Sequence, residues 1–290
     1  MRRTARRCAG RCTLGVPALF AFFTWAAATP VAGQRPGTLS IAYELAQPTG
    51  WVQVRENTIA GTRLSLGRDL GVHLASTLAL RLHLRAGAGV VGVRIDATTL
   101  RGSARLAHDV DFNGSTLQGG TVVRTRTNAT DFLRVVVAYA RPLARVGAGG
   151  ALWGRAGLDA TLLEFRLLGT LSPTTVGHET REDFVTQELP APFLGVGLRL
   201  PLGGGLGLRL AADAGALPWV SSLRHEGGLV RLGQQRWDAD AGLHVLLAAR
   251  WSAGVVLHYT SFTQNEQSHE DGNRFHMASG GGALRLSWSF

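Results

Sequence analysis

WDADAGLHVLLAARW, residues 237–251, shows the pattern that decides the fold. The odd-numbered positions are all apolar: Trp237, Ala239, Ala241, Leu243, Val245, Leu247, Ala249 and Trp251. The even-numbered positions include Asp238, Asp240, His244 and Arg250. Successive side chains of a β-strand point to opposite faces, so this alternation predicts a strand with one apolar face and one charged face.

Similar alternation recurs from residue 38 onward, and no helical period persists for long. We expect about ten strands, with eight or twelve as the neighbouring counts. The expected strands are 38–55, 75–86, 90–107, 119–141, 143–168, 184–202, 204–223, 229–250, 252–264 and 273–290. Tight breaks rich in small residues, expected at 86–89, 141–144, 201–205 and 250–252, take turns with longer polar ones at 56–74, 108–118, 169–183, 224–228 and 265–272. This layout is typical of an all-β, antiparallel, up-and-down transmembrane β-barrel.

The end of the chain supports the same architecture. Leu284, Leu286, Trp288 and Phe290 alternate with Arg285, Ser287 and Ser289. A terminal Phe on an alternating last strand resembles the C-terminal signal of the bacterial outer-membrane β-barrel superfamily. The resemblance covers the architecture from about residue 38 to 290, and we expect residues 34–290 to form one barrel domain. It implies insertion by the barrel assembly machinery into the outer membrane of a diderm bacterium, with lipid and lipopolysaccharide as surroundings.

The first 33 residues are expected to be a secretory signal peptide. Five arginines precede an apolar run from Leu14 to Ala28, and small residues offer cleavage after Ala28 or after Gly33. An uncleaved anchor helix is the alternative. Both cysteines, Cys8 and Cys12, lie in this segment, so the exported chain would have no disulfide.

The basic residues also limit the function. The chain has 30 basic residues, all arginine, and a net charge of +10. The absence of lysine excludes a P-loop lysine, a Schiff-base lysine and a pyridoxal anchor. Removal of the signal would leave 25 basic against 20 acidic residues, a charge of +5. That excess does not indicate a nucleic-acid surface, and we expect no nucleic-acid partner.

A membrane barrel must turn its apolar face toward lipid. Aromatic residues of that parity are expected to form interfacial girdles. At ~3.3 Å per residue and ~40° tilt, the spacing from Trp237 to Trp251 predicts a height of roughly 35 Å. The girdle residues are Tyr139, Trp237, Trp251, Tyr259, Trp288 and Phe290. A soluble exported barrel that binds a lipid inside is the competing architecture, because alternation alone does not say which face is inside.

The polar face would then form a charged interior. Its residues are Glu44, Arg81, His83, Arg85, Arg94, Asp96, Arg134, Arg155, Asp159, Arg199, Arg209, Asp213, Arg236, Asp238, Asp240, His244, His258 and Arg285. Because a ten-stranded barrel is narrow, we expect these groups to pair as a plug, in a protein with a structural or surface-interaction role. A narrow anion or polar-solute channel is the alternative.

Motifs for chemistry are weak. Gly87, Gly89 and Gly92 match G-x-G-x-x-G, but an alternating segment follows instead of the required helix, so the glycines indicate a turn. Four loop clusters of histidine with nearby acids leave open a rim-located lipid or peptide hydrolase. The first residues of these clusters are His108, His178, His225 and His269. The spacing matches no metal motif. We therefore expect no catalytic residues, no metal and no cofactor.

Overall fold

A computed structural model describes residues 36–56, 59–170, 178–184, 189–225, 229–269 and 272–290. The signal peptide expected at residues 1–33 lies outside these ranges. The strands are β1 (Gly37–Gln53), β2 (Leu64–Ser65), β3 (Leu74–Ala86), β4 (Gly89–Arg105), β5 (Val110–Phe112), β6 (Ser115–Leu117), β7 (Val122–Arg126), β8 (Phe132–Val146), β9 (Gly150–Thr170), β10 (His178–Phe184), β11 (Ala191–Gly203), β12 (Leu206–His225), β13 (Leu229–Ala248), β14 (Trp251–Gln267) and β15 (Arg274–Ser289). The described residues contain no helix long and apolar enough to cross a membrane.

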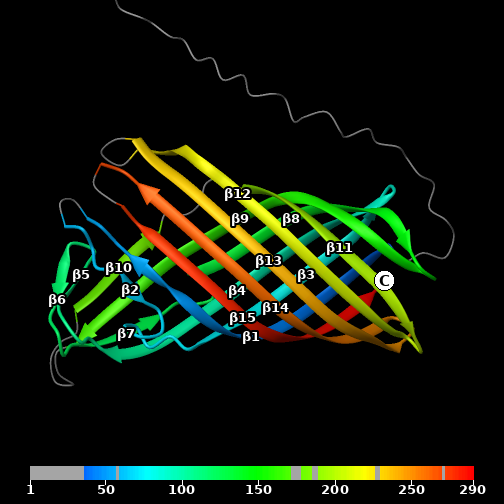
Figure 1. Ribbon diagram of the computed structural model, residues 1–290, viewed down its shortest axis with the longest axis horizontal. Helices are drawn as coiled ribbons and strands as arrows, with labels where there is room; N and C mark the ends of the chain where they lie inside the picture. The colour runs from blue at the N-terminus through cyan, green and yellow to red at the C-terminus, as the bar shows by residue number, and fades with distance from the viewer. Residues whose placement is uncertain (1–35, 57–58, 171–177, 185–188, 226–228, 270–271) are drawn as a thin grey trace, which may run out of the picture.

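The sheet closes on itself. β1 pairs antiparallel with β15, from Thr38 opposite Ser289 to Gln53 opposite Arg274. Around the ring the order is β1, β3, β4, β8, β9, β11, β12, β13, β14 and β15, every neighbour antiparallel. Figure 1 shows the long tilted strands, with β2, β5, β6 and β10 at the end away from the C-terminus. The expected all-β barrel of ten strands is confirmed.

The apolar parity faces outward. Tyr43, Trp237 and Leu257 have relative exposures of 54%, 62% and 65%, whereas Arg134 and Asp159 of the polar parity have 8% and 3%. A soluble barrel that carries a lipid would have the opposite arrangement, with its apolar face inside. The outward apolar belt and the edgeless sheet together satisfy what a bilayer requires of a spanning structure.

Two expected boundaries were wrong. The chain does not turn at residues 141–144: β8 continues there with a bulge between Pro142 and Ala144. It reverses at Gly147 and Gly149, whose φ values of 56° and 90° suit glycine. The strand expected at 119–141 is two strands, β7 and β8. Both pair with β4 and β9, one above the other along the barrel wall.

The expected height of the apolar belt also needs correction. Trp251 is not on the same strand as Trp237, because β13 ends at Ala248 and Trp251 begins β14. Trp237 lies opposite Ser261, ten residues along β14 from Trp251. At ~3.3 Å per residue and ~40° tilt this gives a height of about 25 Å, the height of the apolar band in outer-membrane barrels.

The alternation predicted a polar interior along the whole barrel, but the structure shows an apolar part as well. At the loop end, inward side chains and loop residues form one buried apolar cluster, which we call the apolar plug. Phe262 and Phe275, with ring centroids 6.0 Å apart, lie at its centre, and both are 0% exposed. The plug consists of Val52, Val54, Leu64, Leu66, Leu70, Val72, Ala75, Leu100, Leu106, Val110, Phe112, Leu117, Val123, Phe132, Leu163, Phe165, Leu167, Phe262, Phe275 and Met277.

Candidate functional site in the barrel lumen

A layer of paired charges lies next to the apolar plug, on the side of the turn end. Arg134 on β8 is at the centre of this charged layer. Its Nη2 donates hydrogen bonds of 2.6 Å to Asp159 Oδ2 on β9 and to Asp238 Oδ2 on β13. Asp96 on β4 lies 3.9 Å away. A planar guanidinium can serve several carboxylates at once, so one side chain joins strands from both sides of the lumen.

Two further arginines complete this charged layer. Arg94 donates from Nε to Asp96 at 2.7 Å. Arg236 donates from Nη2 to Thr161 Oγ1 at 2.9 Å, and its Nε lies 3.4 Å from Asp159 Oδ2. The layer thus holds three arginines and three aspartates: Arg94, Arg134, Arg236, Asp96, Asp159 and Asp238. Its formal charge is balanced, as buried charges require.

Arg236 also connects the charged layer to the apolar plug. Its Cζ atom lies 4.3 Å from the ring centroid of Phe262, a cation–π distance. The apolar plug and the charged layer are therefore in contact at these two side chains.

A second polar group lies beside the charged layer, on β1, β13 and β14. His258 Nδ1 is 2.5 Å from Asp240 Oδ1, and its Nε2 is 3.9 Å from Glu44 Oε1. Glu44 and His258 are each 7% exposed. The arrangement places an imidazole between two carboxylates. Only the Asp240 contact is within hydrogen-bond distance, and among the described residues no nucleophile is hydrogen-bonded to this histidine.

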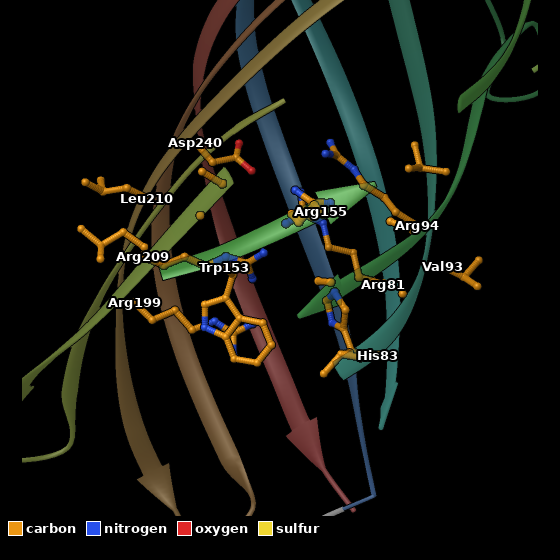
Figure 2. Close-up of a pocket in the computed structure, with 18 residues that line it drawn as sticks. Arg81, His83, Val93, Arg94, Trp153, Arg155, Arg199, Arg209, Leu210 and Asp240 are labelled. Atoms are coloured by element: carbon orange, nitrogen blue, oxygen red, sulfur yellow. The ribbon is translucent and has the colours of Figure 1, made fainter. Parts of the chain in front are cut away.

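A cavity of about 60 Å³ lies between the charged layer and the turn end, and we call it the arginine cavity. Its lining includes Arg81 on β3, Arg199 on β11 and Arg209 on β12. In the described part of the chain, none of these three arginines forms an ion pair with a carboxylate within 4.0 Å. Figure 2 shows Arg81 and Arg94 reaching in from one wall and Arg199 and Arg209 from the opposite wall.

One arginine of the cavity does have a partner. Arg155 on β9 donates from Nη1 to Asp213 Oδ2 on β12 at 2.6 Å. Gly195 on β11 stands between them in the sheet, opposite both residues. A Cβ atom on Gly195 would lie 1.8 Å from Asp213 Oδ1, so only glycine leaves room for this ion pair.

The structure places the predicted interior residues at three levels of burial. Arg85 is exposed because β3 ends one residue later, and Arg199 is exposed at the open side of the arginine cavity. Buried are Glu44, Arg81, Asp96, Arg134, Asp159, Arg236, Asp238 and His258. Half-buried are His83, Arg94, Arg155, Arg209, Asp213, Asp240 and Arg285, whereas His244 is exposed.

Three of the predicted girdle residues meet at the turn end. The Trp251 and Trp288 rings are 6.5 Å apart, and the Trp288 and Phe290 rings are 5.0 Å apart. Trp237 lies at the other height of the belt, as derived above. Tyr259 is 50% exposed, at an intermediate height on β14, and Tyr139 is half-buried on β8.

Several lining residues were missed by the sequence analysis. Trp153 lines the arginine cavity, and its Nε1 is buried without an acceptor. Phe132 and Phe262 belong to the apolar plug. Each of the three lies an even number of positions from a predicted interior residue and so faces the lumen. Trp153 is two positions from Arg155, Phe132 is two from Arg134, and Phe262 is four from His258. An aromatic residue on a polar parity was the signal that could have found them.

The described residues do not gather the loop histidines and acids into a site. No group of three His, Cys, Asp or Glu side chains among them could hold a metal ion. His108 and His269 are exposed, and His276 is 2.9 Å from Thr263 Oγ1. The side chains at 178–183 and 225 lie outside the described ones. Gly87 lies in the turn between β3 and β4 with a φ of 57°, as a hairpin requires.

Comparisons with known proteins give structural likeness only. No protein family model matches the chain, and no curated protein sequence is similar to it. Similar solved structures include the outer membrane protease OmpT from Escherichia coli, with 11% identity over 87% of this chain and 97% of that chain and a TM-score of 0.45. The translocator domain of the autotransporter NalP from Neisseria meningitidis has 13% identity over 89% and 90%, with a TM-score of 0.40. The transport unit of the autotransporter AIDA-I from Escherichia coli has 10% identity over 89% and 92%, with a TM-score of 0.37. These values support no inference about function; the closed ten-stranded sheet with its outward apolar belt is what shows a membrane β-barrel.

Proposed function

We propose that this protein is an integral outer-membrane barrel of a diderm bacterium, exported by its N-terminal signal, with a structural or surface-interaction role and a closed lumen. The observation that supports the proposal is that the lumen contains an apolar cluster and a layer of paired charges, one after the other along the barrel. Lipid, lipopolysaccharide and the assembly machinery would be its envelope partners.

The apolar plug supports a closed lumen. An ion that crosses the loop end would lose its hydration shell against side chains such as Phe112, Phe165 and Phe275, all 0% exposed. Transfer of an unpaired ion into such surroundings costs many kcal/mol. The loop at 62–72 is tied to the β5–β6 hairpin over this end, since Thr62 N donates to Asp111 O at 2.7 Å and Asp111 N donates to Thr62 Oγ1 at 2.9 Å.

The charged layer supports a rigid barrel. Arg134 joins β8 to β9 and β13, so strands that are not neighbours in the sheet are held by side chains across the lumen. Such a cross-link resists collapse or ovalisation of the barrel, because any change of shape would separate buried charges.

An anion channel is the alternative that the arginine cavity favours, since unpaired arginines attract anions to the turn end. A rim hydrolase is the second alternative, but no described cluster supports it.

Cell fractionation and planar-bilayer recording test the proposal, and a hydrolysis assay tests the enzyme alternative. Cell fractionation with heat-modifiable gel mobility should place the folded protein in the outer membrane; a soluble periplasmic protein without a mobility shift would contradict it. Planar-bilayer recording of protein that shows the mobility shift should give no conductance steps. Resolved anion-selective steps that weaken in R81Q, R134Q or R209Q would instead establish the channel, and hydrolysis of lipid A or peptides would establish the enzyme.

A further inference from the structure

We propose that the arginine cavity is a binding site for a doubly charged tetrahedral oxyanion, a phosphate group or its chemical equivalent, entering from the turn end. The proposal rests on the barrel but not on the closed lumen, because a dead-end site and a conducting path both accept an anion at this position.

The charges around the cavity are not balanced. Five arginines line it: Arg81, Arg94, Arg155, Arg199 and Arg209. Arg94 is paired with Asp96, Arg155 is paired with Asp213, and Asp240 is the one carboxylate in the lining. Three aspartates against five arginines leave an excess of two positive charges. A phosphate group carries about −1.5 to −2 near neutral pH, which matches this excess.

The unpaired arginines are positioned at a cost to the sheet. Arg199 lies directly opposite Arg209 on neighbouring strands, and Arg81 lies directly opposite Arg94. Like charges at directly opposite positions destabilise an antiparallel pair. Arg285 on β15 adds further repulsion against Arg81. A purely structural lumen gains nothing from this arrangement, whereas a bound dianion would offset the repulsion.

Buried donors without acceptors point at the same ligand. Arg81 is 8% exposed, and its Nε has no hydrogen-bond partner. Trp153 Nε1 is also buried without one, and this indole can only donate. Leaving such donors unsatisfied costs about 1–3 kcal/mol each, and more for a charged group. Oxyanions accept hydrogen bonds at every oxygen, and the arginine fork fits them in a bidentate geometry.

The size and the shape of the cavity select a small group. One water needs about 10–15 Å³ of such space, so about 60 Å³ holds roughly four to six non-hydrogen atoms. A phosphate or sulfate ion has five. Trp153 supports one side of the site, because the Cζ atom of Arg199 lies 4.9 Å from its ring centroid. In Figure 2 the Trp153 ring lies between Arg199 and His83.

The turn end itself carries positive charge. Arg85, Arg141, Arg145 and Arg250 are exposed there. The four turns at 87–88, 147–149, 204–205 and 249–250 contain no acidic residue. A mouth of one charge sign raises the local concentration of counter-ions and speeds their entry.

The test is calorimetric titration of the refolded full-length barrel, in a zwitterionic detergent at constant ionic strength, with inorganic phosphate, sulfate, acetate and chloride. We expect saturable one-to-one binding of phosphate and sulfate, and at least tenfold weaker binding of the two monovalent anions. R81Q and R209Q should each weaken phosphate binding at least tenfold. R124Q, which removes an exposed arginine of β7, is the matched control and should bind as the wild type does.

A second readout separates binding from structure. Without phosphate, R81Q should melt at the same temperature as the wild type or higher, because it removes an unpaired buried charge; it should also lose the upward shift that phosphate gives the wild type. If R81Q does not refold, R209Q gives the same comparison. Absence of saturable phosphate binding, or equal binding by wild type, R81Q and R209Q, would overturn the proposal.

A competition experiment distinguishes a lipid headgroup from a free phosphate as the natural ligand. The titration is repeated in lipid nanodiscs made of phosphatidylcholine alone or with phosphatidic acid, whose phosphate monoester headgroup can carry two negative charges. Loss of phosphate binding in the second disc assigns the site to a lipid headgroup, and retained binding assigns it to a free phosphate. Conductance is measured separately, so failure of the closed lumen and failure of the anion site give different results.

Discussion

Replacement of Arg134 by methionine tests whether the charged layer holds the barrel together. The side chain is 8% exposed and contacts Asp159 and Asp238 at 2.6 Å. In R134M, Asp159 keeps Arg236 at 3.4 Å and Asp96 keeps Arg94 at 2.7 Å, but Asp238 loses the cation that neutralises it. The balanced layer becomes negative by one charge in a place where water has little access.

The size of the effect follows from that single orphaned charge. Removing one partner of a buried ion pair costs about 3–5 kcal/mol, because the other charge stays desolvated. At 1.4 kcal/mol per factor of ten, this lowers the folding equilibrium constant by about 10² to 10^3.5. Adding D238N should restore part of the loss, since an amide tolerates the site without a cation; we expect a coupling energy of about 1–3 kcal/mol between the two changes.

The assay is urea unfolding of refolded barrel in detergent micelles, followed by tryptophan fluorescence and by the heat-modifiable gel band. Arg81 supplies a matched control, because it is also 8% exposed but has no carboxylate partner. R81M should leave the free energy of unfolding unchanged or raise it. The reasoning would be refuted by an R134M variant within about 0.5 kcal/mol of wild type, a change typical of surface positions, or by equal losses in R134M and R81M.

The remaining predictions concern the sheet and its lipid face. Gly195→Ala should cost about 1–3 kcal/mol, because its Cβ would displace the Asp213 carboxylate and break its half-buried hydrogen bond with Arg155. Gly197→Ala on the same strand, whose Cβ would find its nearest atom at 3.4 Å, should stay near wild type in the same unfolding assay. Leu257→Arg, at mid-height of β14 and 65% exposed, should cost about 2–4 kcal/mol when the barrel is folded into lipid vesicles, whereas Trp251→Arg at the interface should cost about 0–1. Equal costs at the two depths would show that the outward belt does not span a bilayer.

Alternation predicted the ten strands of the ring, although not all their bounds, because its physical cause is local. A strand between lipid and a polar lumen must alternate, and the closed sheet then follows from antiparallel neighbours. The turns depend on backbone conformation instead. Pro142 and its small neighbours looked like a reversal, but a proline also fits a bulge, and the reversal uses the positive φ of Gly147 and Gly149. The same limitation put Trp251 on the wrong strand.

Parity identifies the inward residues but not what surrounds them. Phe262 shares the inward parity of His258, yet one lies in an apolar plug and the other beside two carboxylates. The difference is set by loop residues such as Leu66 and Leu70, which pack over the loop end from distant parts of the chain. The ion pairs likewise depend on contacts between distant parts of the chain, since Arg134 and Asp238 are 104 residues apart.

The order of the three zones along the lumen follows from access to water. Beside the apolar plug the three arginines of the charged layer are buried or half-buried, and three aspartates match them one to one. Toward the turn end an unpaired arginine is tolerated where solvent reaches it, as at the exposed Arg199. Arg81 departs from this rule, since it is 8% exposed and unpaired. Proteins keep an uncompensated buried charge only when something else repays its cost. An arriving anion is the compensation that the cavity beside Arg81 has room for.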